Sequence, residues 1–152
     1  MTYIAAEARQ ELLDCVATAI DQIGVALGAL GDAHERLDDD SAARLETQIF
    51  RPTQLAYGRA QRTYLGFAAR HDLTSRPFAQ PSDSPPSVGP KELVQRAMDS
   101  VAGADATVGT LQDSMMPVDV GDSELRAGLT EIRTLLAELG QRARDIVRSV
   151  GR

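Results

Sequence analysis

The stretch LDCVATAIDQIGVALGALGDAHERL, residues 13–37, decides the fold class. Its apolar positions alternate steps of three and four over more than three heptads, which places them on one face of a long helix. Two later segments repeat this spacing, so we expect several long helices packed with their apolar faces inward. The three sets are Leu13, Val16, Ile20, Ile23, Leu27, Leu30, His34 and Leu37; Val94, Ala97, Val101, Ala104, Val108, Leu111 and Met115; and Leu125, Leu129, Ile132, Leu136, Leu139, Ala143, Ile146 and Val150.

The segment FRPTQLAYGRAQRTYLGFAARHDL, residues 50–73, is less regular but also amphipathic. It holds four of the six Phe and Tyr residues of the protein. At 100° per residue its aromatic residues share one arc and its arginines the opposite arc. The aromatic arc contains Phe50, Tyr57, Tyr64, Phe67 and His71, and the arginine arc contains Arg51, Arg59, Arg62 and Arg70. Pro52 should kink this helix or restart it.

Capping and helix-breaking residues set the expected boundaries. Asp40 or Ser41 can cap the second helix, Pro90 suits a first turn, and Asp122 or Ser123 can cap the fourth helix. We therefore expect one domain, residues 1–152, with helices at about 3–38, 41–72, 90–116 and 122–150. A flexible loop rich in Pro and Ser, residues 73–89, joins the middle pair.

The predicted fold class is all-α, an antiparallel four-helix bundle with long helices. Residues 1–40 carry a net charge of −7, residues 41–76 of +4, residues 77–121 of −4 and residues 122–152 of +1. In an up-down-up-down order every neighbouring pair would have opposite signs, which favours antiparallel neighbours. The loop, however, could span roughly 55 Å when extended, more than the 45 Å or so of a 30-residue helix. One crossover through the loop is therefore also possible, and the topology stays open.

The amino-acid composition limits the classes of protein to which this chain can belong. The chain has 152 residues, a net charge of −6, a single cysteine and no tryptophan. One cysteine cannot form an internal disulfide, and Ala, Leu and Val must fill most of the core. We find no secretory signal pattern and expect no window to approach the roughly 20 apolar residues of a membrane helix. The expected protein is soluble and cytoplasmic, with no membrane span.

The sequence offers no recognisable catalytic or cofactor-binding constellation. We identify no nucleotide fingerprint, no nucleophile motif and no Glu-x-x-His pair for a metal, so we expect no cofactor and no metal site. His34 lies within the first apolar stripe, where Glu46 or Gln48 could satisfy its ring. His71 should lie more than about 35 Å from it along the second helix, too far for a shared metal. Cys15 is interpreted as a small packing residue.

Three hypotheses of function remain, in descending order. The first is a non-enzymatic interaction or adaptor protein that binds a protein partner or its own copies through Arg51, Arg59, Arg62 and Arg70. The second is a bundle that binds a small molecule in an aromatic-lined core pocket of His34, Tyr57, Tyr64, Phe67 and His71. The third is an enzyme whose site forms between subunits. The overall negative charge argues against nucleic acid as a partner.

Overall fold

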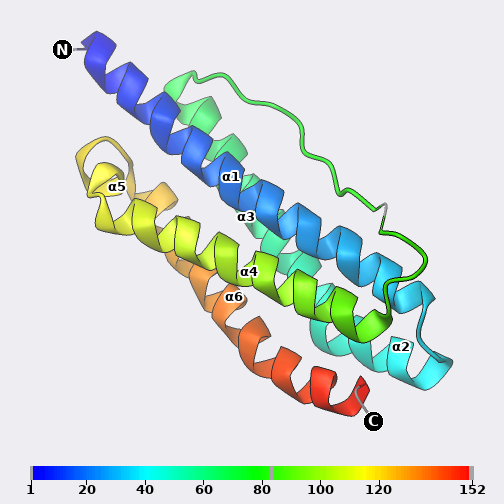
Figure 1. Cartoon of the computed structure of the whole chain (residues 1–152). Coiled ribbons are helices and arrows are strands. Elements are labelled where there is room, and N and C mark those ends of the chain that lie inside the picture. The colour runs from blue at the N-terminus through cyan, green and yellow to red at the C-terminus, as the bar shows by residue number, and fades with distance from the viewer. Residues whose placement is uncertain (1, 83, 151–152) are drawn as a thin grey trace.

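The computed structural model describes residues 2–82 and 84–150, and it confirms an all-helical protein whose helices pack together. The ends of the expected domain, residues 1, 151 and 152, and position 83 of the loop lie outside the described residues. The elements are α1 (Thr2–Glu35), α2 (Asp39–Leu45), the π-helical turn η1 (Glu46–Phe50), α3 (Arg51–His71), α4 (Pro90–Asp113), α5 (Met116–Asp119) and α6 (Ser123–Val150) (Figure 1).

The core lies between four long helices. α1 contacts α3 and α4, and α6 contacts the same two helices. The expected apolar faces of α1, α4 and α6 are buried from Leu13 to Leu30, from Val94 to Leu111 and from Leu125 to Ile146, respectively. Met115 is the exception in α4, because it follows the helix end and is 52% exposed. The side chain of Val150 lies outside the described residues.

His34 was wrongly expected to be buried in the apolar stripe of the first helix. α1 ends at Glu35, three residues earlier than the predicted end at residue 38, and His34 is exposed in its last turn. His34, Glu46 and Phe50 line the same surface hollow, but no hydrogen bond of the His34 ring occurs among the residues that the structure describes. Leu30 and Ala33 just before it are fully buried, so the burial of this face ends within the last turn of α1.

The second predicted helix is continuous through a π-helical turn at the position of Pro52. Proline has no N–H to donate, and its ring collides with the carbonyl one turn earlier in a regular helix. The turn η1 relieves this, since the Arg51 amide donates to the Glu46 carbonyl and Pro52 begins α3 in its first turn. The Thr53 hydroxyl donates to the Ile49 carbonyl at 2.7 Å. The predicted irregularity at Pro52 is thus present as a π-helical turn within a continuous helix, not as a restart.

The connection between α3 and α4, which we call the strap (residues 73–82 and 84–89), lies along α1 (Figure 1). The Gln10 carboxamide exchanges hydrogen bonds with the backbone of Thr74. Further on, the Asp32 carboxylate accepts from Ser82 and Ser84, and the Arg36 guanidinium donates to carbonyls of residues 84, 85 and 88. The strap therefore follows α1 in the same direction, from its first turns to its end.

Two glycines of α1 allow the strap to lie against the helix backbone. A Cβ added at Gly28 would lie 1.5 Å from the Pro81 carbonyl oxygen, and one at Gly24 would lie 2.8 Å from the Ala79 carbonyl oxygen. Both distances are too short for any side chain, so glycine is required at these positions for close approach. Gly31, only three residues further, has open space around its missing side chain.

The contacts between helices do not follow net charge. α1 and α4 belong to segments of −7 and −4, yet they form the most extensive helix pair, through small and aliphatic residues. α3 and α6 both belong to positive segments, yet ion pairs join them, among them Arg59 to Glu131 at 2.7 Å. Individual side chains at the contacts, rather than segment totals, decide which helices are neighbours.

Candidate functional site

The aromatic residues of α3 form part of the packed core. Tyr64 and Phe67 are almost fully buried, and Tyr57 is 8% exposed. The Tyr64 hydroxyl accepts from the Arg76 amide at 3.0 Å, and its ring meets that of Phe78 edge-on at 5.0 Å. Burial raises the pKa of the Tyr57 phenol, and Asp21 adds to the effect. These side chains thus already have protein partners, and the strap supplies two of them.

The two histidines lie in different parts of the molecule. His71 is half-buried at the end of α3, where its ring packs on Phe67 at 4.5 Å and its Nε2 lies 2.8 Å from a carboxylate oxygen of Asp122. His34 lies beside Glu46, in the last turn of α1. The structure therefore does not bring His34 and His71 together with the three core aromatics in one pocket.

Asp122 is the centre of a polar cluster between α3 and α6. Its carboxylate accepts two hydrogen bonds from Arg70, at 2.8 and 2.9 Å, and one from the Leu125 amide at 2.8 Å, which caps α6. Partial burial raises the pKa of the Asp122 carboxyl. Hydrogen bonds from Arg70, the Leu125 amide and His71 outweigh that effect and hold the pKa well below its ordinary value. The predicted cap at Asp122 is confirmed.

This depressed pKa predicts a loss of stability in acid. Because the folded-state pKa of Asp122 lies below the unfolded value of about 3.9, its contribution to stability is complete above about pH 5 and is lost as pH falls through the unfolded value toward the lower folded-state pKa. Asp122→Asn keeps a capping side chain but removes the charge. We expect it to lower the free energy of unfolding by about 1–2 kcal/mol at neutral pH, a range discounted for partial solvent exposure.

Urea unfolding at several pH values measures this contribution. The difference between the parent protein and Asp122→Asn should shrink steadily between about pH 5 and pH 2. Taking the difference cancels the contribution of Asp32, whose pKa is lowered as well, because burial is outweighed by hydrogen bonds from Ser82 and Ser84. A difference that stays constant over this range would show that the charge of Asp122 is not what stabilises the cluster.

The four arginines of the predicted interaction surface have different surroundings. Arg70 pairs with Asp122 and with Glu124, and Arg59 donates to Glu131, so both guanidinium groups join α3 to α6. Arg51 lies 3.7 Å from Glu46, and both of those side chains are largely exposed. Arg62 is exposed and has no ion pair among the residues that the structure describes. Of these four arginines, Arg51 and Arg62 thus take no part in the contact between α3 and α6.

The outward face of α3 combines these two arginines with exposed apolar residues. Leu55 and Leu65 are 58% and 51% exposed. Between and beside them, steps of three and four residues place further exposed positions within an 80° arc at 100° per residue. We call this set the basic stripe: Arg51, Leu55, Gly58, Arg62, Leu65 and Ala69. The helix from Arg51 to His71 contains no Asp or Glu, so the only charges in the stripe are the positive charges of Arg51 and Arg62.

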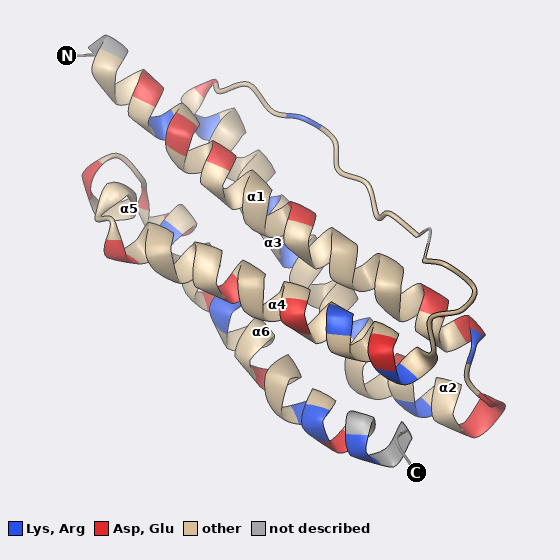
Figure 2. Ribbon diagram, viewed as in Figure 1, with Lys and Arg blue, Asp and Glu red and all other residues tan. Residues whose placement is uncertain are grey.

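The outward face of α1 carries a second stripe of opposite sign, which the sequence analysis missed. It follows the same three-four spacing, and every member is exposed. We call this set the acidic stripe: Ile4, Glu7, Glu11, Asp14, Thr18, Asp21 and Val25. Figure 2 shows its acidic residues as red bands along α1. The signal in the sequence was a second heptad series within the same helix, on the face opposite Leu13 to Leu30.

Other reactive groups are isolated. Cys15 is half-buried and faces Thr107, Leu111 and Met116 across a surface hollow. Burial raises the pKa of its thiol, and Glu11 and Asp14 add to the effect, so the nucleophilic thiolate is disfavoured. Within residues 2–82 and 84–150 no three His, Cys, Asp or Glu side chains are grouped so that they could hold a metal ion.

α1 is also apolar enough, by length and composition, to cross a membrane. An 18-residue window within its stretch Ile4–Glu35 reaches a mean hydropathy of 1.5, so the expectation that no window approaches this threshold was wrong. In the fold, 61% of that window is buried inside the protein. A core helix of a soluble protein meets the same criterion, and composition alone does not distinguish the two.

No protein-family model matches the chain, and neither a curated protein nor a solved structure matches it.

Proposed function

We propose that the protein is a non-enzymatic helical protein that self-associates, with the acidic stripe of one copy bound to the basic stripe of another. The observation that carries the proposal is the pair of exposed heptad stripes of opposite charge on α1 and α3. Two basic stripes would repel each other through Arg51 and Arg62, and two acidic stripes through four carboxylates. The pairing of unlike stripes is the one that charge favours.

The spacing of the two stripes supports the same pairing. Glu11 and Val25 are separated by the same number of residues as Arg51 and Leu65. With the helices side by side in one direction, Arg51 lies opposite Glu11 and Leu65 opposite Val25, and Arg62 is one residue beyond the level of Asp21, which already pairs with Arg76 of the strap at 2.6 Å. In the opposite direction Leu55 lies opposite Val25, and Arg62 lies opposite Thr18, one turn from Asp14. Either orientation buries an exposed leucine and brings an arginine of the basic stripe within about one turn of a carboxylate.

The proposed fold is the antiparallel four-helix bundle with one crossover through the strap. It is supported by the contacts of α1 and α6 with both α3 and α4, and by the course of the strap along α1. Since α1 and α3 are neighbouring helices, a two-fold dimer can make the contact twice, with α1 of each copy on α3 of the other, whereas a single head-to-tail contact produces a closed ring or an open chain of copies.

The expected association is weak and sensitive to salt. Exposed ion pairs contribute only about 0.2–1 kcal/mol each and are screened by salt. The apolar contribution comes from Leu55, Leu65, Val25 and Ile4, whose exposed fractions in one copy are 45–65%. We therefore expect a dissociation constant of roughly 10 µM to 1 mM in low salt, corresponding to about 4–7 kcal/mol.

Sedimentation velocity over a concentration series tests the proposal. The variant Arg51→Glu/Arg62→Glu should remain monomeric at concentrations where the parent protein associates, because both stripes are then acidic. The variant Glu7→Arg/Glu11→Arg should also remain monomeric. A mixture of the two variants should associate again, since acidic stripes of one meet basic stripes of the other. Circular dichroism should show unchanged helicity in both.

The matched control is Arg44→Glu/Arg142→Glu. It changes the net charge by the same amount at two exposed arginines outside both stripes. It should associate like the parent protein. A parent protein that is monomeric at about 1 mM in low salt would exclude self-association through the stripes, and equal loss of association in the control would show that only net charge matters.

A further inference from the structure

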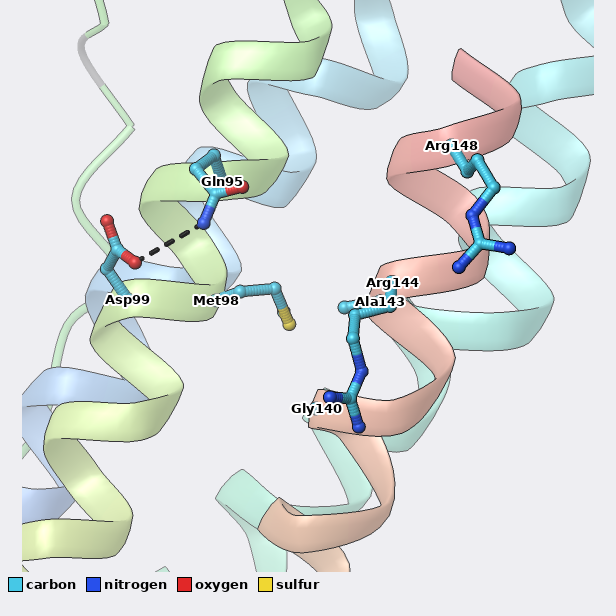
Figure 3. A pocket seen from close by; sticks show the side chains of 7 residues that line it. All are labelled: Gln95, Met98, Asp99, Gly140, Ala143, Arg144 and Arg148. Atoms are coloured by element: carbon cyan, nitrogen blue, oxygen red, sulfur yellow. Dashed lines mark hydrogen bonds between the residues drawn. The ribbon is translucent and has the colours of Figure 1, made fainter. Parts of the chain in front are cut away.

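A surface pocket lies between α4 and α6, well separated from both stripes. Its volume is about 500 Å³, and its lining residues come from the first half of α4 and the last half of α6. Figure 3 shows the Met98 side chain pointing from α4 toward α6, with Gly140 and Ala143 on the facing helix. The floor is apolar, and the volume lies within the range of about 300–1,000 Å³ of small-molecule sites.

Two arginines of α6 form one wall of the pocket. Arg144 and Arg148 are four residues apart, so their side chains lie on the same face of the helix (Figure 3). Like charges at this spacing destabilise a helix by a few tenths of a kcal/mol. No carboxylate lies within ion-pair distance of either guanidinium in the part of the chain that the structure describes. A bound anion would relieve this repulsion.

The opposite wall of the pocket, on α4, is polar: the uncharged carboxamide of Gln95 lies beside the charged carboxylate of Asp99. The Gln95 carboxamide donates to the Asp99 carboxylate at 3.4 Å, across one turn of α4 (Figure 3). Asp99 would repel an anion placed on the α4 side of the pocket. The charge distribution therefore favours a ligand whose anionic group lies on the α6 side and whose body extends toward Met98.

We propose that this pocket binds a small amphipathic carboxylate, such as a medium-chain fatty acid. The carboxylate accepts hydrogen bonds from Arg144 and Arg148, and the alkyl chain covers Met98, Gly140 and Ala143. Guanidinium groups suit this role because they donate two parallel hydrogen bonds to a carboxylate. The proposal goes beyond self-association through the stripes, since it uses neither α1 nor α3.

The test is a titration with decanoate, below its micelle concentration, of protein carrying ¹³C-labelled methionine methyl groups. We expect the Met98 methyl signal to shift to saturation with a dissociation constant below about 1 mM. The Met115 methyl, exposed beyond the far end of α4, serves as the internal control and should not move. Decanol, the neutral analogue with the same chain length, should bind at least about tenfold more weakly.

Two variants separate the apolar and the charged halves of the site. Gly140→Leu should abolish binding, because open space surrounds a Cβ at Gly140 and the new side chain fills the pocket without a clash. Arg144→Gln/Arg148→Gln should weaken decanoate at least about tenfold, while decanol binding stays unchanged. The pair of variants keeps the test valid if one of them fails to fold.

Each remaining outcome would overturn the proposal. Equal affinity for decanoate and decanol would show an apolar hollow without anion recognition. A Met98 signal that does not saturate would show that no site exists. Unchanged decanoate binding in the double arginine variant would place the carboxylate elsewhere.

Discussion

Gly28→Ala is expected to detach the strap from α1 and destabilise the protein. Its Cβ would lie 1.5 Å from the Pro81 carbonyl oxygen and 2.7 Å from the carbonyl carbon, so the strap backbone must move away. The hydrogen bonds of Ser82 and Ser84 with Asp32 would then be strained or lost. Overpacking of this kind costs about 1–3 kcal/mol. The strap should also become sensitive to limited proteolysis by subtilisin.

Gly31→Ala is the matched control for this experiment. It introduces the same side chain in the same helix, but nothing lies within 4 Å of the added Cβ. Alanine is the better helix former by about 1 kcal/mol, so this variant should unfold at slightly higher urea concentration than the parent protein. If both variants had the same stability and the same cleavage rate, the close contact between the strap and α1 would be refuted.

Gly128→Ala is expected to have the second large effect, at the contact between α6 and α3. An added Cβ would lie 2.4 Å from the Thr63 hydroxyl oxygen and 2.8 Å from the Thr63 methyl carbon. Thr63 is itself buried and bonded to Arg59 through its hydroxyl, so it has little freedom to move. We expect a loss of about 1–3 kcal/mol in the free energy of unfolding, measured by urea titration.

A second substitution identifies the cause of that loss. Thr63→Ala removes both atoms of the clash, so the double variant Gly128→Ala/Thr63→Ala should recover part of the lost stability, with a coupling energy of about 0.5–3 kcal/mol. Gly140→Ala, on the same helix but in open space, should be neutral or slightly stabilising. Additive effects of the two substitutions would contradict the predicted contact.

The helical spacing of apolar residues was sufficient to predict most of the core. The period alone defines the inward face of α1, α4 and α6, and the aromatic arc of α3 is buried as expected for Tyr64 and Phe67. His34 occupies a position of the apolar series in the first helix, but it lies in the last turn of α1 and is exposed. The exposure of His34 depends on where the neighbouring helices end. The spacing of apolar residues within one helix gives no information about those ends.

The candidate sites were less predictable, because they depend on contacts between helices. A helical wheel places Arg59, Arg62 and Arg70 on one outward arc, yet Arg59 and Arg70 meet carboxylates of α6 while Arg62 does not. Which arginines form ion pairs depends on which helix lies beside α3. The sequence did not determine that neighbour, because the loop of residues 73–89 is long enough for either topology. The pocket beside Met98 likewise requires the relative placement of α4 and α6.

The strap also makes the protein two helical hairpins joined by a tether. α1 and α3 contact each other and are joined locally through α2 and η1, and α4 and α6 contact each other and are joined through α5. The tether makes the docking of one hairpin on the other an intramolecular event, governed by an effective concentration rather than by diffusion. Because hydrogen bonds hold the tether along α1, it leads the chain to the end of α1, from which α4 returns along α1 in the most extensive helix pair of the fold.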